Sequence, residues 1–294
     1  MDFYLFDVNH GQSAAVKLPN GRWCIFDVGS KSDFSPIQWI MSVDGPRFNP
    51  FFPGASPPFR FLKATISHLH GDHLADYARL FMASPEFLKI VDFDLEYLRD
   101  VANSSTPDSL RRVYDFCRRY RNGFGPTRTI PDYGGVAIQE MGLPVSDARW
   151  LGGSAVSRVN NASVITRIDC YGNSILLCGD MEKEAWEFVL TNPFLRSRWR
   201  PFVTGIDVLV APHHGHKSGY STELLDLARP SVVLVSVVGG DDSVDSRYSG
   251  AAEGITVNGR TYKSVTTRTN GHIHISIAPP TTPFGKGVQT WHNL

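Results

Sequence analysis

The sequence predicts an α/β protein in which helices cover β-sheets on two outer faces. In both halves of the chain, short apolar or alternating runs typical of strands are followed by segments with helical periodicity. The 294 residues are 42% hydrophobic, which is enough for a sizeable core. The apolar run Val232–Val238, broken only by Ser236, is typical of a strand that is buried on both faces of a sheet.

The first quarter of the chain contains strands and one irregular stretch. Three runs predict strands, at Phe3–Val8, Ala14–Leu18 and Trp23–Asp27. Six prolines between residues 35 and 58 predict that this stretch is not helical, and its phenylalanines are expected to fix it to the core or to line a substrate cleft. A fourth strand, Phe61–Ser67, ends directly at His68.

Between Leu74 and about Tyr120 the pattern is mostly helical. One apolar face is expected to contain Leu110, Val113, Tyr114 and Cys117. The same stretch carries Arg111, Arg112, Arg118, Arg119 and Arg121. We interpret these arginines as a solvated helix face, with contact to a nucleic-acid backbone as the alternative. Residues 123–153 are expected to be rich in loops, with one strand at Val136–Met141.

The second half repeats the alternation of strand and helix. The expected elements are a hairpin of Ser163–Cys170 and Ser174–Cys178 with a three-residue loop, a helix Lys183–Leu190, a strand Val208–Ala211, a helix Thr222–Ala228 and the strand Val232–Val238. Residues 239–259 are expected to form a polar loop. A turn at Asn270-Gly271 leads into a last strand, His272–Ala278, and His292 is expected to lie in a loose tail. We interpret His272 and His274 as a surface pair and not as metal ligands.

Composition excludes several functional classes. Lys plus Arg and Asp plus Glu each number 29, so the chain has no polybasic coat and any anionic substrate must be met by local charge. No apolar run is long enough for a bilayer-spanning helix, and the residues after Met1 show no signal-peptide pattern. The four cysteines are widely scattered, so we expect reduced thiols in a cytoplasmic protein without a membrane partner.

Histidine is distributed unevenly and gives the strongest functional signal. Six of the ten histidines fall into two clusters, the first of which is His68-Leu69-His70-Gly71-Asp72-His73. Three imidazoles and one carboxylate directly after a strand are the ligands that borderline divalent metals prefer. Alternation along the extended chain favours His68 and His70 for one metal, and the turn that follows favours Asp72 and His73 for a second.

Two later strands end in further candidate ligands. The apolar strand before Gly179 is followed by Asp180, and Val208–Ala211 is followed by His213 and His214. The C-terminal ends of strands are where open α/β sheets gather ligands and catalytic groups. Each signal alone is weak, because Asp and His are common at strand ends as caps or turn residues. The three clusters together predict a metal centre.

The order of these motifs resembles the metallo-β-lactamase fold superfamily of hydrolases and, within it, the metal-dependent hydrolase domain of the ComEC competence proteins. The closer match is carried by Phe6-Asp7-Val8 with Gly11-Gln12, Phe26-Asp27-Val28-Gly29, Asn160-Asn161-Ala162-Ser163, Leu177-Cys178-Gly179-Asp180, and Pro212-His213-His214-Gly215 with Lys217-Ser218. It runs in order from about Met1 to Ala278, except between Leu74 and Val159. No ComEC-type transmembrane region is visible, so a role in DNA uptake does not carry over.

The resemblance implies a four-layer αβ/βα sandwich with metals at the shared edge of two sheets. It implies one domain over residues 1–294 with a helical insertion at about 74–159. It also implies two divalent metal ions, zinc or manganese. Their ligands would be His68 and His70 for the first ion, Asp72 and His73 for the second, Asp180 as a bridge, and His213 or His214 to complete the second site.

Two positions of this ligand set stay open. We favour His213 over His214, because it is closer to the end of its strand. Asp27 matches an early superfamily aspartate that more often orients a ligand than binds metal, and a turn cap is an equal alternative.

The chain also departs from these patterns at two places. Many superfamily members have a further histidine ligand where this chain has Asn160 and Asn161, which leaves the first metal short of a strong ligand and makes the two amides candidate substrate contacts. Conversely, His70 stands where ComEC-like domains commonly have aspartate, so the first loop is more similar to the general superfamily.

We expect a metal-dependent hydrolase and favour a phosphodiesterase or nuclease. Two adjacent divalent cations lower the pKa of a water between them, and hydroxide can then attack phosphorus near neutral pH. The candidate catalytic residues are Asp72, Asp180, Lys217 and Ser218. Lys217 and Ser218 follow the second cluster closely enough to contact phosphate, with a solvated loop lysine as the alternative for Lys217.

Other functions stay open on the sequence alone. One alternative is hydrolysis of a lactone, thioester or β-lactam, since fold does not choose the bond that is cleaved. Another is an effector that binds metal or nucleic acid without turnover. The oligomeric state does not follow from these residues.

Overall fold

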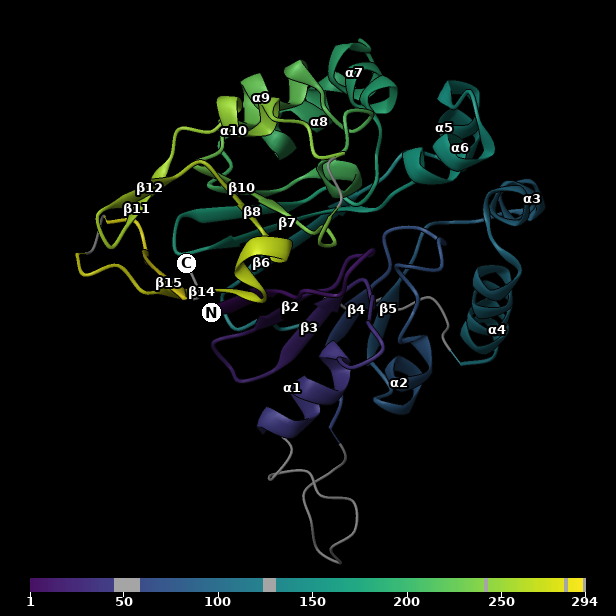
Figure 1. Cartoon of the computed structure of the whole chain (residues 1–294), viewed down its shortest axis with the longest axis horizontal. Helices are drawn as coiled ribbons and strands as arrows, with labels where there is room; N and C mark the ends of the chain where they lie inside the picture. The colour runs from purple at the N-terminus through teal and green to yellow at the C-terminus, as the bar shows by residue number, and fades with distance from the viewer. Residues whose placement is uncertain (45–58, 124–130, 241–242, 283–284, 293–294) are drawn as a thin grey trace, which may run out of the picture.

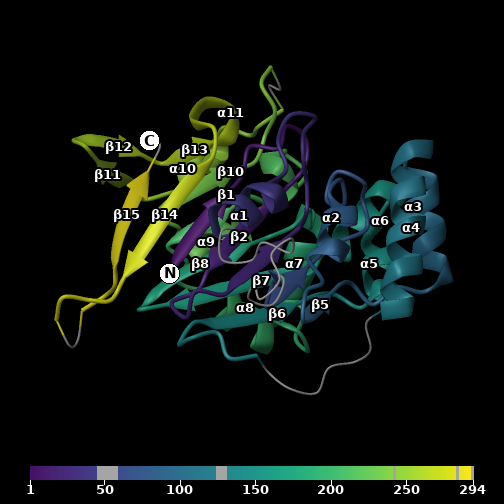
Figure 2. The same cartoon turned by 90° about the horizontal axis from the view of Figure 1, so that it is seen from below.

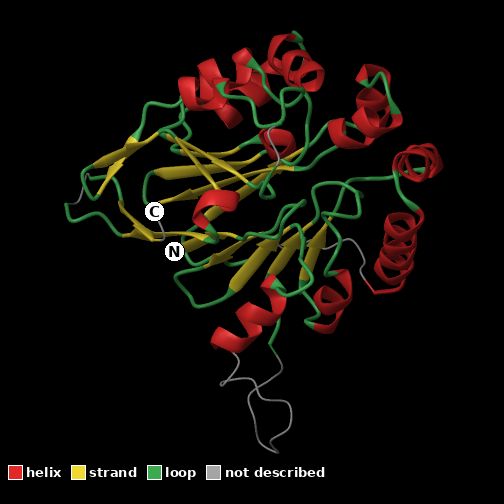
Figure 3. Ribbon diagram, in the orientation of Figure 1, coloured by secondary structure: helices red, strands yellow, loops and turns green. Residues whose placement is uncertain are grey.

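The computed structural model describes residues 1–44, 59–123, 131–240, 243–282 and 285–292. Two large sheets pack face to face, and helices cover the outer face of each, which gives the predicted four-layer αβ/βα sandwich (Figures 1 and 3). The core between the sheets combines residues of both, such as Phe3 and Leu5 from the first and Ile175 and Val210 from the second, all fully buried.

The first sheet contains seven strands within the described residues. Their order is β15 (Val288–His292), β14 (Ile273–Ala278), β1 (Asp2–Leu5), β2 (Ala14–Lys17), β3 (Trp23–Phe26), β4 (Lys63–Thr65) and β5 (Phe87–Lys89). Neighbours from β15 to β3 pair antiparallel, whereas β3, β4 and β5 are parallel. The loop after β4 therefore leaves the sheet at the C-terminal edge of a parallel segment.

The second sheet has six strands in the part of the chain that the structure describes. Their order is β13 (Ser264–Thr266), β10 (Val232–Val235), β9 (Val208–Val210), β8 (Asn173–Leu177), β7 (Ile165–Cys170) and β6 (Ala137–Met141). Strands β8, β9, β10 and β13 are parallel, so the loops after β8 and β9 leave at the same edge. A separate small hairpin joins β11 (Ile255–Val257) to β12 (Arg260–Tyr262).

The helices form three groups. Below the first sheet lie α1 (Pro36–Asp44) and α2 (Tyr77–Met82), and above the second lie α7 (Lys183–Thr191), α8 (Arg196–Val203), α9 (Thr222–Ala228) and α10 (Arg247–Ala251) (Figure 1). Four more gather at one side of the sandwich, α3 (Leu95–Ser104), α4 (Pro107–Gly123), α5 (Val145–Leu151) and α6 (Ala155–Asn161), as Figure 2 shows from below. A short helix α11 (Thr267–Asn270) precedes β14. None of the described helices is long and apolar enough to cross a membrane.

The prediction that residues 35–58 are not helical is wrong for its first part, where α1 begins at Pro36. Proline is well tolerated in the first turn of a helix, because the amide proton it lacks would have no partner there. The next proline is Pro46, and residues 45–58 lie outside the described residues. Phe59 is buried and packs edge-on against Phe61, with ring centroids 5.0 Å apart.

Several other local predictions also need correction. Tyr114 is 67% exposed on α4, and Phe116 is the fully buried aromatic residue there. Residues 123–153 include α5, and the expected loop 239–259 includes α10 and β11; β5 and α8 were not predicted. These elements are short, so their periodicity is weak and their packing against the sheets decides their conformation.

Three turns also differ from expectation. The β7–β8 loop has two residues, Tyr171 and Gly172, because Cys170 pairs with Asn173, and both loop residues have the positive φ that a tight hairpin requires. Gly271 ends α11 and does not close a hairpin. His292 is part of β15, where its ring stacks on His274 at 4.4 Å.

Candidate metal centre

The three predicted ligand clusters meet at one edge of the sandwich. The loop after β4 carries Ser67 to His73, the loop after β8 carries Asp180, and the short 3₁₀ helix η2 (Pro212–Gly215) follows β9. A backbone hydrogen bond from His213 N to Gly179 O at 3.0 Å joins the last two loops, and one from Val164 N to Ser67 O at 2.8 Å joins the first loop to the segment before β7. The fold therefore brings together residues that are more than 100 positions apart in the sequence.

Four side chains surround what we term the second position: Asp72, His73, Asp180 and His214. His73 Nε2 lies 3.4 Å from Asp180 Oδ1 and 3.8 Å from Asp72 Oδ2. His214 Nε2 lies 3.5 Å from Asp180 Oδ2 and 3.6 Å from Asp72 Oδ2. Two imidazole nitrogens thus face carboxylate oxygens around one small space.

Three side chains surround the first position: His68, His70 and again Asp180. His68 Nε2 lies 3.0 Å from His70 Nδ1 and 3.9 Å from Asp180 Oδ2. Asp180 faces both positions, which is where the resemblance implies a bridging carboxylate.

The donors of this centre fit divalent cations. In the described part of the chain, the buried side-chain atoms without a hydrogen-bond partner include His73 Nε2, Asp180 Oδ1 and His214 Nε2, which all belong to this cluster. An unpartnered buried polar atom is costly, so three of them that converge indicate a missing partner. Imidazole and carboxylate donors suit a borderline divalent cation such as zinc.

Charge interactions within the cluster shift its pKa values strongly. Burial lowers the pKa of His214, but Asp180 and Asp72 outweigh it and raise that pKa to about 10. Burial likewise opposes a charged His73, but Asp180, Asp27 and Asp72 raise its pKa well above the usual value. Burial and the neighbouring His73 lower the pKa of His68.

The two carboxylates respond in the opposite sense. Burial raises the pKa of Asp180, yet His214 and His73 hold it well below its ordinary range. Burial also raises the pKa of Asp72, but the neighbouring His73 and His214 outweigh burial and lower that pKa below its ordinary value. A cation at the second position would take the place of the protons on these imidazoles.

Asp27 supports the loop that follows β4. It is 2% exposed and accepts hydrogen bonds from Ser67 N at 2.7 Å and Ser67 Oγ at 2.9 Å. Its Oδ2 also lies 2.9 Å from His73 Nδ1, which leaves His73 Nε2 facing the second position. The contact to His73 favours an orienting role over the turn-cap alternative.

His214, and not the favoured His213, faces Asp72 and Asp180. Both histidines have left-handed backbone angles, φ 49° and 52°, which turn the chain so that the second imidazole points into the cluster. His214 Nδ1 lies 3.2 Å from Ser236 O, whereas His213 Nδ1 lies 2.7 Å from Ser218 Oγ and 3.7 Å from Glu182 Oε1. Distance from the strand end was a poor guide because it ignores this turn.

The two asparagines are not open to a substrate, contrary to expectation. Asn160 and Asn161 end α6 and are each 1% exposed. Asn160 Nδ2 donates to Glu182 Oε1 at 2.9 Å, and Glu182 N donates to Asn161 Oδ1 at 3.0 Å. Together they fix the loop that carries Asp180.

The predicted phosphate contacts differ from each other in accessibility. Lys217 is exposed to solvent. Ser218 Oγ lies 2.7 Å from His213 Nδ1 and 2.9 Å from His216 Nδ1, so it holds these imidazoles and is not a free donor.

Sequence reasoning missed Glu182 and Ser163 as structural parts of the site. Ser163 Oγ accepts from Asp180 N at 3.1 Å and lies 3.4 Å from His68 Nδ1. Its place in the Asn-Asn-Ala-Ser motif was the available signal. Glu182 follows Asp180 by two residues, and proximity to Gly179-Asp180 was the only signal for it.

The arginines of α4 have partners on the protein surface. Arg119 lies over Tyr77 at 5.8 Å, and Arg121 lies over Phe93 at 5.6 Å. Arg111 and Arg118 each lie within 4.0 Å of an aspartate one turn earlier, and all four are exposed. These contacts fit the solvated helix face.

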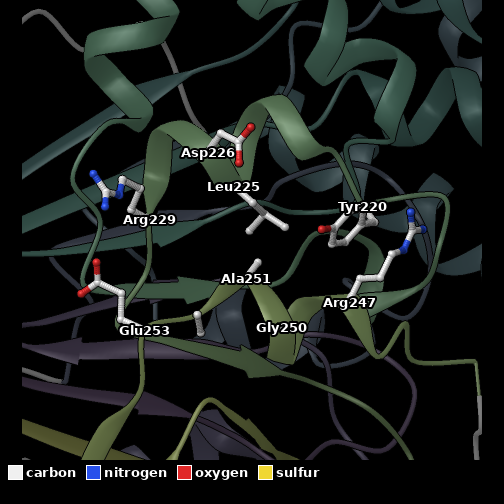
Figure 4. Close-up of a pocket in the computed structure, with 9 residues that line it drawn as sticks. Tyr220, Leu225, Asp226, Arg229, Arg247, Gly250, Ala251 and Glu253 are labelled. Carbon is white, nitrogen blue, oxygen red and sulfur yellow. The ribbon is translucent and has the colours of Figure 1, made fainter.

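A separate groove of about 510 Å³ lies between α9 and α10. Figure 4 shows Arg247 beside Tyr220 at one end and Arg229 near Glu253 at the other. The Arg247 guanidinium lies 4.0 Å from the Tyr220 ring centroid. Neither of the His–Asp groups at ligand distance in the described residues includes a residue of this groove, so we place the functional site at the strand ends.

Fold and site together define an αβ/βα sandwich with a candidate dinuclear metal centre at the shared edge of its sheets. No family model and no curated protein matches the sequence. Similar solved structures include the metallo-β-lactamase fold protein YhfI from Bacillus subtilis, at 14% identity and TM-score 0.40 over 82% of this chain and 88% of that chain.

Two further solved structures are similar to the chain. Human tRNase Z, short form, has 13% identity and TM-score 0.41 over 81% of this chain and 93% of that chain. CmlA, a diiron β-hydroxylase from Streptomyces venezuelae, has 16% identity and TM-score 0.41 over 85% of this chain and 48% of that chain. Because all three are low in identity and TM-score, function has to be inferred from the residues of this chain.

Proposed function

We propose that this protein is a metal-dependent hydrolase and that its substrates are phosphodiesters, including nucleic acids. The observation that carries the proposal is the convergence of three buried ligand atoms without a hydrogen-bond partner, on His73, Asp180 and His214. These atoms lie beside a second pair of imidazoles, in which His68 Nε2 is 3.0 Å from His70 Nδ1.

In this proposal His68, His70 and Asp180 hold one cation, and Asp72, His73, His214 and Asp180 hold the other. Zinc and manganese both accept this donor set. When bound, two such cations lower the pKa of water and offset the charge that develops on a phosphate. Asp27 orients His73, and Ser163 fixes the backbone amide of Asp180.

Phosphate is favoured over other hydrolysable groups by two features. Lys217 presents an exposed ammonium three residues after His214, where it can attract an anionic oxygen. The Asn160–Ser163 and Pro212–Ser218 segments resemble the ComEC-like branch, and in this chain they hold the loops of the centre. We also propose that residues 1–294 form one domain with a single active site.

The test combines metal analysis with a substrate panel. Purified protein is assayed for bound metal and then offered bis(p-nitrophenyl) phosphate, single-stranded DNA and a chromogenic β-lactam, each with zinc or manganese. We expect up to two cations per chain and turnover of the diesters. Turnover of the β-lactam alone would contradict the phosphodiesterase assignment, and no metal uptake at all would contradict the hydrolase.

A further inference from the structure

Helices α3 and α4 touch the metal-binding loop directly, although they lie in the stretch where the family resemblance lapses. Ser104 Oγ, in the last residue of α3, lies 3.1 Å from His70 Nε2. The fully buried Tyr97 accepts a hydrogen bond from Leu69 N at 3.2 Å. Ser109 packs so closely on Gly71 that a β-carbon there would lie 2.0 Å from its hydroxyl oxygen. Three successive residues of the loop therefore have a partner in this helix pair.

The hydrogen bonds of Ser104 decide which nitrogen of His70 is free. Ser104 Oγ donates its single proton to Val101 O at 3.2 Å, as a serine near the end of a helix commonly does. It must then accept from His70 Nε2, so the proton of the neutral ring lies on Nε2 and the lone pair on Nδ1. That lone pair faces His68.

The same reasoning applies to His68. Ser67 Oγ donates to Asp27 Oδ2 at 2.9 Å and so accepts from His68 Nδ1 at 3.0 Å. The lone pair of His68 is then on Nε2, 3.0 Å from His70 Nδ1. Two lone pairs that face each other at this distance repel unless a cation lies between them. The network thus prepares both nitrogens for one metal ion.

Helix α3 is also anchored to the other half of the site. Asp100 is 2% exposed and lies 2.6 Å from Arg149 Nε on α5 and 2.7 Å from Arg158 Nη2 on α6. Helix α6 ends in Asn160 and Asn161, which hold Glu182, two residues after Asp180. The helices therefore connect the loop of His70 to the loop of Asp180.

We propose that Ser104, at the end of α3, is a positioning residue for the first metal ion. This inference rests on the proposed function, since it concerns one of its two cation positions. Removing an outer partner of a metal-binding histidine typically lowers metal affinity 10- to 100-fold. We assign three side chains of the described residues to the first position, His68, His70 and Asp180, so a change in the orientation of His70 should weaken binding there measurably.

The test measures metal binding and needs no substrate. Zinc and cobalt(II) are titrated into metal-stripped wild type, Ser104→Ala, Ser104→Thr and Ser105→Ala, with calorimetry for affinity and the visible cobalt spectrum for geometry. We expect Ser104→Ala to lose 10- to 100-fold affinity at one of two sites, with a changed cobalt spectrum, and Ser104→Thr to restore both. Ser105→Ala, a neighbouring hydroxyl that does not touch His70, should match the wild type.

The outcomes separate this inference from the proposed function. If wild type binds two cations and Ser104→Ala binds both with unchanged affinity and spectrum, the positioning role is wrong and the hydrolase proposal stands. Equal losses in Ser104→Ala and Ser105→Ala would also overturn it, because they would show a general disturbance of the helix turn. If wild type binds only one cation, the first position is not formed and the role of Ser104 is wrong, whereas the hydrolase proposal fails only if no cation binds.

Discussion

The two proposed cation positions are built in different ways from neighbouring residues. The second position has two imidazoles and two carboxylates, and its supports are Asp27 and Ser236 at the ends of core strands. The first has two imidazoles and a shared carboxylate, and the outer nitrogen of His70 is supported by a helix outside the sandwich.

This difference predicts unequal affinities. More donors and a more deeply anchored support favour the second position. The first position depends on packing between α3 and the sandwich, so it should be the weaker and the more easily lost. The predictions below test that contrast.

The largest effect is expected at the residue that both positions share. Asp180→Ala should reduce diester hydrolysis to the background rate and lower metal content from two ions to at most one, because it removes a ligand from each position. Asp226→Ala, at an exposed aspartate on α9, is the control. Near-normal turnover by Asp180→Ala would show that this carboxylate does not bridge two metals.

The next effect separates the positions. The double variant His68→Ala/His70→Ala should lose one cation per chain and keep the other, since His73 and His214 belong to the second position. Metal content by mass spectrometry, after dialysis against a low zinc concentration, checks this. Retention of both ions would refute the ligand assignment.

A smaller effect is expected on stability, where the helices meet the sandwich. Asp100→Ala leaves Arg149 and Arg158 without their buried partner and should lower the free energy of unfolding by about 3 kcal/mol, the lower end for a broken buried pair, since the arginines are partly exposed. Glu96→Ala removes the more exposed partner of Arg149 and should cost less than about 1 kcal/mol. Urea unfolding of both variants gives the comparison, and equal losses would contradict the anchoring role of Asp100.

The smallest effect concerns pH. Folding raises the pKa of His214 from 6.5 to about 10. Its imidazolium therefore stabilises the folded chain fully at a pH below 6.5, and this contribution is lost as the pH rises through about 10. In EDTA, the melting temperature of wild type should therefore fall more between pH 6.5 and 10 than that of His214→Gln. With zinc, the melting temperature of wild type should instead rise between pH 6.5 and 10, because protons and cations compete for the same nitrogens. Parallel pH curves for the two proteins in EDTA would contradict the pairing of His214 with Asp180 and Asp72.

The sequence predicted the second position better than its surroundings. The spacing of Asp72 and His73 after a strand, and of Asp180 after another, is a local pattern that the fold preserves. The choice between His213 and His214 depends on two left-handed residues, and histidine has no sequence signal strong enough to predict them. Ser104 lies 34 residues from His70, so only the packing of α3 reveals their contact.

The left-handed pair at His213 and His214 also sets a conflict between robustness and chemistry. At φ 49° and 52°, a residue with a β-carbon pays roughly 1–2 kcal/mol that glycine avoids. A search for thermostable variants of this protein should therefore favour glycine at His213. At His214 the same gain is set against the loss of its pairing with Asp72 and Asp180, so selection on melting temperature should separate the two histidines.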